Sequence, residues 1–293
     1  MLPNFLVIGA EKSGTTWLYH NLKQHPQIFL PETKEIHYFN ARNSNLEEQD
    51  RYSKQNIDWY ESFFRNASSE KAVGEITPMY ICDEHAYKRI HETLGEVKLI
   101  VMLRNPIDRA YSHYWMARWK GHVNDSFKKI VETKDQRFIQ RGLYGEQLER
   151  YYKLWSPENT QVLIFDNFFE NKNTYLKKIF DFLEIDESGF LEDHLINHKI
   201  YGSGSYKSPF LYKFQKETAK FLRKFPVLHP AMDKVKKSGL ISSIENMNRD
   251  KESYPAMPDE LRSELRDYYS SDIDKLEQLV GINLSIWKES SEH

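Results

Sequence analysis

The chain has 293 residues, with 41 Lys and Arg against 43 Asp and Glu, a formal net charge of −2, and 40% hydrophobic residues. These values describe a globular protein with enough chain for a buried core, and they give no global basis for binding nucleic acid or an anionic membrane. The single cysteine, Cys82, excludes an intrachain disulfide and a cysteine cluster for a metal.

Short apolar segments alternate with helical patterns along the chain. We expect strands over Asn4–Ile8, Lys71–Gly74, Lys98–Leu103 and Gln161–Phe165, and helices over Thr15–Gln24, Asp83–Leu94, Pro106–Trp119, Phe138–Trp155, Thr174–Leu183 and Pro258–Leu279. Strands that are apolar throughout are typically covered on both faces. The pattern predicts an α/β fold, a parallel β-sheet with helices on both faces. No repeat, low-complexity tract or linker divides residues 1–293, so we expect a single domain.

The first predicted strand-to-helix turn carries a phosphate-binding pattern. Gly9 and Gly14 keep the spacing of the nucleotide loop G-x-x-x-x-G-K-[ST], but Thr15 stands where the lysine belongs and Lys12 lies inside the loop. Backbone N–H groups at such a turn converge on an anion, and the helix dipole favours it. The lysine and the neighbouring hydroxyl groups favour a phosphate site over the alternative, a plain connection between strand and helix.

A cation stands at the end of the third predicted strand, where a nucleotide hydrolase needs an acidic residue for Mg²⁺. Arg104 follows Lys98–Leu103 directly, and Ser112 lies further along the next predicted helix. A guanidinium group binds phosphate through two donors, so Arg104 and Ser112 suit a second phosphate. The structural alternative is that Arg104 caps the helix or pairs with Asp108.

At these residues the chain resembles the PAPS-dependent sulfotransferases. The segment Lys12-Ser-Gly-Thr-Thr-Trp17 is similar to the family's 5′-phosphosulfate loop, and residues 104–112 are similar to its 3′-phosphate segment. The resemblance implies a P-loop-like sulfotransferase fold with PAPS (3′-phosphoadenosine 5′-phosphosulfate) as donor, PAP as product and no metal. It also implies nucleotide contacts from Lys12, Ser13, Gly14, Thr15, Thr16, Arg104 and Ser112.

Two further positions have nucleotide roles implied by the resemblance. Trp17 matches a position that stacks on adenine in some members, or it is a core aromatic residue. The segment from Tyr201 to Pro209 resembles a loop that closes over the nucleotide 3′ end, which would bring Lys207 and Ser208 to the phosphate. The alternative there is a flexible Gly/Ser connector. The basic stretch 199–237 has three interpretations: it lines the acceptor site, it forms a helix at a membrane surface, or it forms an ordinary packed helix.

Three more segments narrow the resemblance to the heparan sulfate branch of the family and to related bacterial sulfotransferases. These segments are Thr33–Asn40, Ile57–Phe64 and Gly74-Glu-Ile-Thr-Pro-Met-Tyr80, and with the phosphate motifs they cover residues 1 to about 180. The first is similar to the segment that carries the catalytic base. Ile76 stands where this branch usually has a lysine, so a charged contact to an acidic polysaccharide is in question.

Sulfuryl transfer needs in-line attack, a base near the acceptor and cations near the leaving oxygen, by the same logic as phosphoryl transfer. Glu35 is the candidate base, and Lys12 would neutralise the leaving phosphate oxygen. His37 lies two residues on, on the same face if the segment is extended. From the residues alone, a surface carboxylate beside Lys34 is the favoured alternative for Glu35. His113 is a second candidate base.

Glu75 and Tyr80 are further candidate acceptor contacts, together with His113. Glu75 either lines the acceptor pocket, braces Lys12 or is a surface acid. We expect loops 36–60, 76–85 and 113–145 to set the choice of acceptor.

The sequence therefore predicts a PAPS sulfotransferase acting on a hydroxyl or amine of a carbohydrate or glycoconjugate. The alternatives are a small-molecule, lipid or polyketide hydroxyl, a P-loop kinase, and a non-catalytic nucleotide-binding module. No segment approaches the ~20 apolar residues of a membrane span. We expect a cytoplasmic enzyme, from bacteria, with a shortened form of a membrane-anchored enzyme as the alternative. The oligomeric state stays open.

Overall fold

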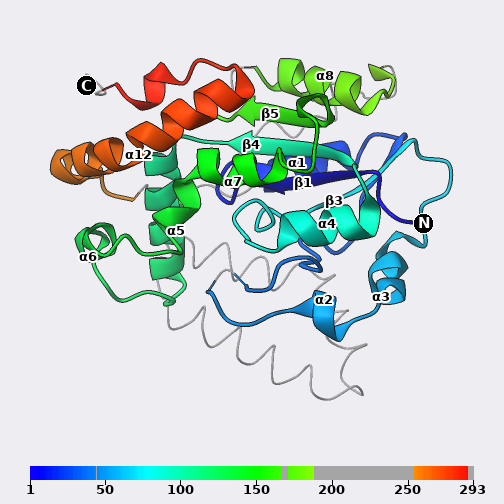
Figure 1. The fold of residues 1–293 in the computed structure, drawn as a ribbon, viewed down its shortest axis with the longest axis horizontal. Helices are drawn as coiled ribbons and strands as arrows, with labels where there is room; N and C mark the ends of the chain where they lie inside the picture. The colour runs from blue at the N-terminus through cyan, green and yellow to red at the C-terminus, as the bar shows by residue number, and fades with distance from the viewer. Residues whose placement is uncertain (44, 167–170, 188–253, 290–293) are drawn as a thin grey trace, which may run out of the picture.

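The computed structural model describes residues 1–43, 45–166, 171–187 and 254–289 (Figure 1). Its five strands are all parallel and form one sheet in the order β2-β3-β1-β4-β5. The strands are β1 (Phe5–Gly9), β2 (Ile28–Phe29), β3 (Ala72–Ile76), β4 (Lys98–Leu103) and β5 (Thr160–Ile164). The four predicted strands are confirmed to within two residues. β2 was not predicted, because two residues carry no readable alternation.

The α-helices that the described residues form are α1 (Thr15–Leu22), α2 (Arg51–Lys54), α3 (Ile57–Glu61), α4 (Ala86–Leu94), α5 (Pro106–Trp119), α6 (Phe127–Glu132), α7 (Tyr144–Tyr151), α8 (Lys172–Leu183) and α12 (Asp259–Val280). The bounds of α5 are those predicted. The helix predicted over Phe138–Trp155 is wrong in extent: a 3-10 turn at Gln140–Gly142 precedes α7. Gly142 lies so close to Tyr269 of α12 that a Cβ there would come 2.8 Å from its ring.

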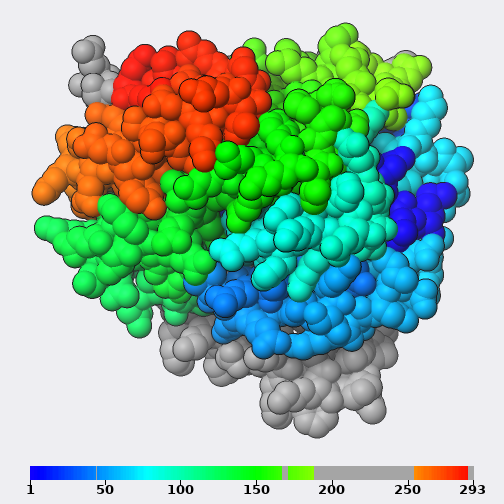
Figure 2. All heavy atoms as spheres, in the orientation of Figure 1, coloured from blue at the N-terminus to red at the C-terminus, as the bar shows by residue number. Residues whose placement is uncertain are grey.

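Alternate residues of each central strand feed two separate cores. Leu6 and Ile8 of β1 point to the core shared with α4, α5, α7 and α12, whereas Phe5 and Val7 point to the core shared with α1 and α8. This alternation follows from the two-residue period of a strand. The expectation of a sheet covered on both faces is confirmed, and Figure 2 shows α12, orange to red, packed against the green α7 region.

Parallel strands place their carboxyl ends at one edge of the sheet, where ligands of such sheets bind. The register sets Val7 of β1 opposite Ile76 of β3, and Gly9 opposite Val101 of β4. The turns that follow these three strands therefore begin at the same edge. No helix formed by the described residues is long and apolar enough to cross a membrane.

Candidate functional site

The turn between β1 and α1 has the backbone geometry of an anion-binding loop. Lys12 and Gly14 both adopt left-handed conformations, with φ of 68° and 82°. The positive φ favours glycine at position 14, and a Cβ there would also come 2.4 Å from the ring of Phe165. Both the backbone conformation and the packing therefore require glycine. The first turn of α1 contains no acidic residue, and no side chain of the described residues caps it. Such a helix start favours a bound anion.

Ser13 adds a buried hydroxyl group to the loop. Its side chain is 0% exposed, and its Oγ has no hydrogen-bond partner among the described residues. A buried polar atom without a partner costs free energy, so a bound group that accepts or donates a hydrogen bond here would be stabilising. Thr15, at the start of α1, is also buried.

The side chain of Lys12 reaches from the loop to α5. Its Nζ is 3.6 Å from Sδ of Met116. Burial first, and then the positive charges of Lys120 and Arg104, lower the pKa of Lys12 from 10.5 to about 8, while Glu11 opposes this shift. The charges of Lys120 and Arg104 therefore disfavour a second charge at Lys12 in the unliganded protein.

The turn between β4 and α5 keeps Arg104 available. Asn105 caps α5 by accepting a hydrogen bond from the N–H of Ile107 at 3.0 Å. Asp108 pairs with Arg262, with Nη2 of the arginine 2.9 Å from Oδ1. Both structural alternatives for Arg104, as a cap and as a partner of Asp108, are wrong. Its guanidinium lies over the ring of Phe165, 5.9 Å from the centroid.

Ser112 and His113 lie near the middle of α5. Both residues are buried, with exposed fractions of 7% and 4%. Burial, followed by the charges of Arg141, Arg109, Lys12 and Lys120, holds the pKa of His113 well below 6.5. The ring is therefore neutral, and its Nδ1 has no partner among the described residues.

Glu35 and His37 lie together on the segment that follows β2. His37 Nε2 is 3.6 Å from Oε2 of Glu35, and Lys34 donates a hydrogen bond to the other carboxylate oxygen. Burial favours the neutral acid, but the hydrogen bond from His37 and the charge of Lys34 outweigh it and lower the pKa of Glu35 to about 2. The segment is not extended, since φ is 63° at Glu35 and 55° at His37. The two side chains still meet, through a turn rather than through strand alternation.

A buried network underlies this segment. Tyr80 donates to Glu75 at 2.9 Å and accepts a hydrogen bond from the N–H of Tyr38 at 3.1 Å. Tyr60 and Thr77 also donate to Glu75, at 2.8 and 2.9 Å. Glu75 is 1% exposed, so the surface alternative for it is wrong. Tyr80 is also fully buried, and its hydrogen bond with Tyr38 supports the Glu35 segment. Contact of Glu75 and Tyr80 with an acceptor stays a prediction.

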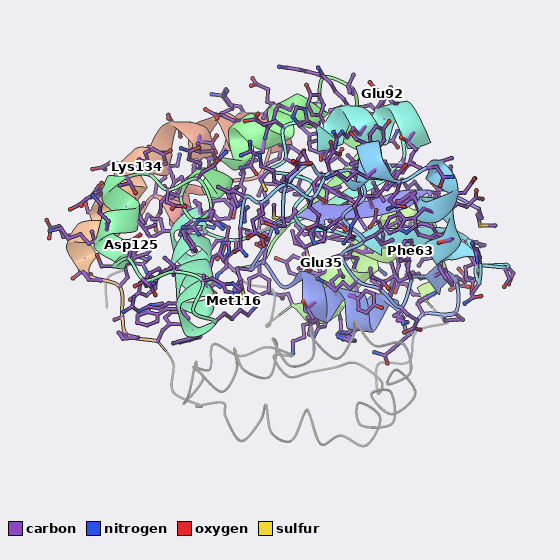
Figure 3. All side chains as sticks on the ribbon, turned by 90° about the horizontal axis from the view of Figure 1, so that it is seen from below. Glu35, Phe63, Glu92, Met116, Asp125 and Lys134 are labelled. Atoms are coloured by element: carbon purple, nitrogen blue, oxygen red, sulfur yellow. The ribbon has the colours of Figure 1, made fainter. Side chains whose placement is uncertain are left out.

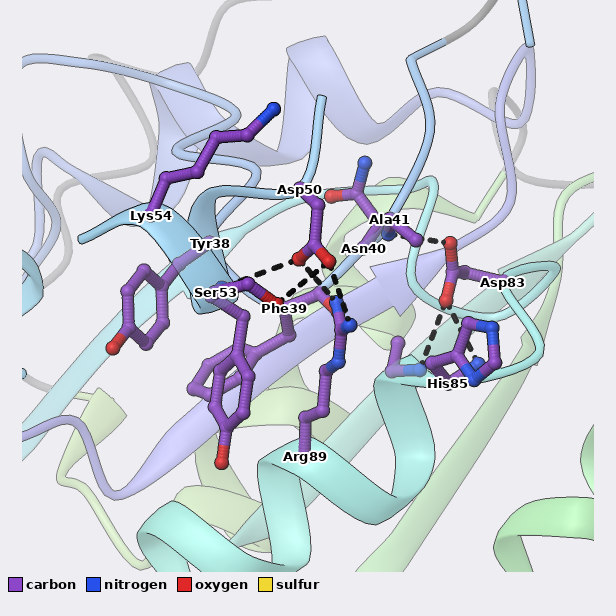
Figure 4. Close-up of polar contacts among 12 residues, drawn as sticks. Tyr38, Phe39, Asn40, Ala41, Asp50, Ser53, Lys54, Asp83, His85 and Arg89 are labelled. Carbon is purple, nitrogen blue, oxygen red and sulfur yellow. Dashed lines mark hydrogen bonds and ion pairs between the residues drawn. The ribbon is translucent and has the colours of Figure 1, made fainter. Parts of the chain in front are cut away.

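The far end of the same segment is tied to α4 (Figure 4). Asp83 accepts a hydrogen bond from the N–H of Ala41 at 2.8 Å. Arg89 donates to the carbonyl of Phe39 at 3.1 Å and binds both carboxylate oxygens of Asp50, at 2.9 and 3.1 Å. His37 itself is held by Asn40, with Nδ1 3.1 Å from Oδ1. The candidate base thus sits on a segment that is fixed on both sides.

Sequence reasoning missed two partners of the phosphate loops. Arg141, in the 3-10 turn before α7, pairs with Glu11 at 2.6 Å. Asp166, just after β5, accepts hydrogen bonds from the N–H of Asn105 and from Nε1 of Trp287, the latter at 2.6 Å. Both contacts join segments more than 60 residues apart, and no local pattern indicates them.

A pocket of about 360 Å³ opens beside the Glu11–Arg141 pair. Its walls come from residues 41–46, 79–85, 136–143 and 146–150. Its polar lining combines amide and guanidinium side chains with carboxylates and an imidazole: Arg42, Gln136, Gln140, Arg141, Gln147 and Arg150, with Asp83, Glu84, Glu146 and His85. The loops predicted to select the acceptor contribute most of these walls.

The remaining predicted residues are placed as follows. Trp17 is 3% exposed and belongs to the core between the sheet, α1 and α8. Lys207, Ser208 and the stretch 199–237 lie outside the described residues. Figure 3 labels Glu35 near the centre of the view and Met116, the neighbour of Lys12, to its lower left. No group of three or more His, Cys, Asp or Glu placed to hold a metal occurs within 1–43, 45–166, 171–187 and 254–289.

Comparison with known proteins matches this chain to one family model and to several proteins that are described as sulfotransferases. The family model described as sulfotransferase domain matches residues 2–225. The membrane-associated sulfotransferase kil1 of Dictyostelium discoideum is 41% identical over 142 residues, 45% of this chain and 28% of that protein. The bifunctional heparan sulfate N-deacetylase/N-sulfotransferase 4 of Mus musculus is 34% identical over 187 residues, 56% of this chain and 20% of that protein. The chain thus matches less than a third of the length of either relative.

A solved structure supports the fold. The crystal structure of a sulfotransferase from Alicyclobacillus acidocaldarius superposes with a TM-score of 0.68 over 99% of this chain and 100% of that chain, at 23% identity. At this identity the likeness concerns the fold.

Proposed function

This chain belongs to the sulfotransferase domain family, and we propose that it moves a sulfuryl group from PAPS to a hydroxyl or amine of a carbohydrate or glycoconjugate. The donor, the base and the acceptor class are the proposed parts. The observation that carries the proposal is the pairing of two cationic strand ends. Lys12 follows β1, Arg104 follows the neighbouring strand β4, and the charge of Arg104 acts on Lys12.

Two cationic corners at the ends of neighbouring strands suit a nucleotide with phosphates on both sides of its ribose. The start of α1, with Ser13 and Lys12, would hold the 5′ group. Arg104, which forms no ion pair with any described residue, and Ser112 would hold the 3′-phosphate. A mononucleotide with a single 5′ group would leave Arg104 unused.

The proposed step is an in-line transfer. The acceptor oxygen or nitrogen forms a bond to sulfur while the bond between sulfur and the bridging oxygen breaks. The proton of the acceptor goes to Glu35, and the negative charge that develops on the 5′-phosphate of PAP is balanced by Lys12. A placed base contributes about 10²–10⁴-fold to such a step, and a preorganised cation at the leaving oxygen stabilises the transition state.

The charge state of Glu35 suits a proton acceptor. With a pKa of about 2 it is a carboxylate at neutral pH. Lys34 and His37 both stabilise that carboxylate, which keeps it ionised but weakens it as a base. An acceptor that displaces the Lys34 ammonium would strengthen Glu35 at the moment of transfer, and His37 would remain to hold its orientation.

We propose that the acceptor binds in the pocket beside Arg141, because its many hydrogen-bonding side chains suit a polyhydroxylated ligand. The similarity to a heparan sulfate N-deacetylase/N-sulfotransferase supports a carbohydrate and leaves N-sulfation open beside O-sulfation. A small-molecule, lipid or polyketide hydroxyl is the second candidate, because the pocket would also hold a compact ligand.

The test is transfer of ³⁵S from labelled PAPS. Polysaccharides with free hydroxyl groups, the same polymers with free amines, and small alcohols are offered in parallel in EDTA. Label in a polysaccharide would support the proposal, and its position would separate O- from N-sulfation. Label only in small alcohols would replace the carbohydrate acceptor. Bound donor with no transfer to any acceptor would favour a binding module instead.

A further inference from the structure

The pocket of about 360 Å³ is bounded by both segments to which the proposed function assigns reacting groups. One wall contains Arg141, whose guanidinium group pairs with Glu11 of the phosphate loop at 2.6 Å. Another wall contains Arg42, whose carbonyl accepts a hydrogen bond at 2.6 Å from Asn40, in the segment that carries Glu35. A ligand in this pocket would therefore lie against the supports of both segments.

Gln147 of α7 brings an unpaired hydrogen-bond acceptor to the pocket lining. The residue is 4% exposed, and its Oε1 has no hydrogen-bond partner among the described residues. Its Nε2 donates to the carbonyl of Gln140 at 3.3 Å, a bond that only the amide nitrogen can make, so the oxygen is the unpaired end. A buried polar atom without a partner costs free energy, so a ligand that donates a hydrogen bond to Oε1 would be stabilised.

Arg150 adds an unpaired donor to the same face of α7. It lies three residues after Gln147 and also lines the pocket, and its Nε is buried without a partner among the residues that the structure describes. A hydroxyl group both donates and accepts, so a sugar with neighbouring hydroxyl groups suits both atoms. A carboxylate or a sulfate only accepts, so it would leave Oε1 of Gln147 unpaired and bring negative charge toward it.

The charges of the lining point the same way. Among its described residues there are as many carboxylates as guanidinium groups: Asp83, Glu84 and Glu146 against Arg42, Arg141 and Arg150. One of these guanidinium groups, that of Arg141, is already paired with Glu11. The lining therefore carries no excess of positive charge that would attract an acidic sugar.

We propose that this pocket binds an uncharged, polyhydroxylated sugar unit of the acceptor, and that Gln147 and Arg150 select this unit over an acidic one. The inference rests on the proposed function and names the substrate class of its acceptor site. Both residues determine specificity: they form no bond to sulfur and take no proton in the transfer. An acidic unit is disfavoured because it leaves a buried acceptor unpaired and meets the carboxylates of the lining.

The test uses two oligosaccharides that differ in charge at one position of each repeat. One alternates N-acetylglucosamine with glucuronic acid, and the other is its carboxyl-reduced form, in which each carboxylate is replaced by a primary alcohol. Calorimetry measures the binding of each to PAP-saturated protein, and transfer from ³⁵S-labelled PAPS gives KM and kcat for each. We expect the uncharged form to bind about 10-fold more tightly or better and to have the lower KM.

Three variants test the two side chains. Gln147→Leu removes the unpaired acceptor, Arg150→Met removes the unpaired donor, and Gln278→Leu on the exposed face of α12 is the matched control. Each of the first two should raise KM for the uncharged form about 10-fold and leave the affinity for PAP unchanged, and Gln147→Leu should also narrow the preference over the acidic form. Because Gln147 also holds the carbonyl of Gln140, Arg150→Met keeps the test valid if Gln147→Leu does not fold.

The outcomes separate this inference from the proposed function. Equal or tighter binding of the acidic form would overturn the inference, and so would a wild-type KM in both pocket variants. Binding of neither oligosaccharide to protein that holds PAP would also overturn it, while the proposed donor stands. Absence of PAP binding in the wild-type protein would instead remove the proposed function itself.

Discussion

Arg141 Nη1 lies 2.6 Å from Oε2 of Glu11, and the two side chains are only 6% and 16% exposed. The pair joins the turn before α7 to the phosphate loop, next to Lys12. Two helices also hold this turn: Arg109 of α5 donates to the carbonyl of Phe138, and Tyr269 of α12 donates to the carbonyl of Ile139. The phosphate loop is thus anchored to α5 and α12 through one buried ion pair.

Breaking that pair should loosen the loop. We expect Arg141→Met to lower the free energy of unfolding by about 3 kcal/mol, because it removes the guanidinium group that pairs with the largely buried Glu11 carboxylate, and to weaken PAP binding. Urea unfolding and calorimetry measure the two effects. Arg137→Met, which removes an arginine paired with Asp135 at 23% exposure of both side chains, is the control and should cost less than about 1 kcal/mol. Equal effects of the two variants would contradict the anchoring role.

Glu35→Gln tests the base. We expect turnover to fall by about 10²–10⁴-fold while the affinity for PAP stays unchanged, because Gln keeps the shape but accepts no proton. Glu32→Gln, at a carboxylate whose side chain is 91% exposed, is the matched control. Wild-type turnover in Glu35→Gln would transfer the role to another group, His113 first.

The pH dependence follows from the same residue. The pKa of Glu35 is about 2 against an ordinary value of 4.5, so its carboxylate is fully formed above the ordinary value and is lost only as pH falls toward 2. We therefore expect no acidic loss of kcat from Glu35 between pH 5 and pH 7. The contradicting result would be a loss of kcat between pH 7 and pH 5 in the wild type that is absent from the remaining activity of Glu35→Gln. It would mean that the pKa of Glu35 is much higher than its ion pair with Lys34 allows.

Lys12→Met should stabilise the unliganded protein. Because the folded-state pKa is about 8 and the ordinary value is 10.5, the unfolded state binds more protons between these pH values. The free energy of unfolding of the wild type therefore rises with pH across that window, and the penalty is complete below pH 8. Removing the charge should add on the order of 2 kcal/mol at pH 7 and abolish tight PAP binding. Lys128→Met should change neither, and a destabilised Lys12→Met would contradict the charge argument.

Gly14→Ala tests the shape of the loop. Gly14 and Gly121 have similar positive φ, 82° and 69°, but a Cβ meets the Phe165 ring at 2.4 Å only at Gly14, whereas nothing lies within 4 Å at Gly121. Backbone strain of about 1 kcal/mol should appear in both alanine variants, and the overlap should add to it in Gly14→Ala alone. Thermal unfolding and PAP titration measure this, and equal losses would mean that Phe165 simply moves aside.

Tyr80→Phe tests the support beneath Glu35. The change leaves the buried N–H of Tyr38 without its acceptor, which should cost about 1–3 kcal/mol and lower kcat through displacement of the Glu35 segment. Tyr60→Phe also removes a hydroxyl group that donates to Glu75, at 2.8 Å, but it keeps the ring that stacks on Tyr38 at 4.7 Å between centroids and removes no hydrogen bond to the segment. It should reduce stability and leave kcat near wild type. The reverse ranking in kcat would show that Tyr80 has no positioning role.

Local features of the site could be predicted from the sequence, and long-range ones could not. Asn105 and Pro106 mark the start of α5 within two residues, so its bounds were predicted as observed. The phosphate loop likewise lies within one short segment. By contrast, the Glu11–Arg141 contact spans 130 residues and the hydrogen bond from Tyr60 to Glu75 depends on how α3 packs on β3. Such contacts follow from tertiary packing, which no periodicity in a single sequence reports.

The most direct test of the account is a thermal shift of EDTA-treated protein with PAP, compared with Mg-ATP and with 5′-ADP. A ligand that binds only the native state at about 100 times its Kd should add about 2.7 kcal/mol to the free energy of unfolding. The account predicts a clear shift with PAP in the absence of metal and a smaller one with 5′-ADP. A shift with Mg-ATP and none with PAP would contradict the 3′-phosphate site at Arg104 and the proposed donor with it.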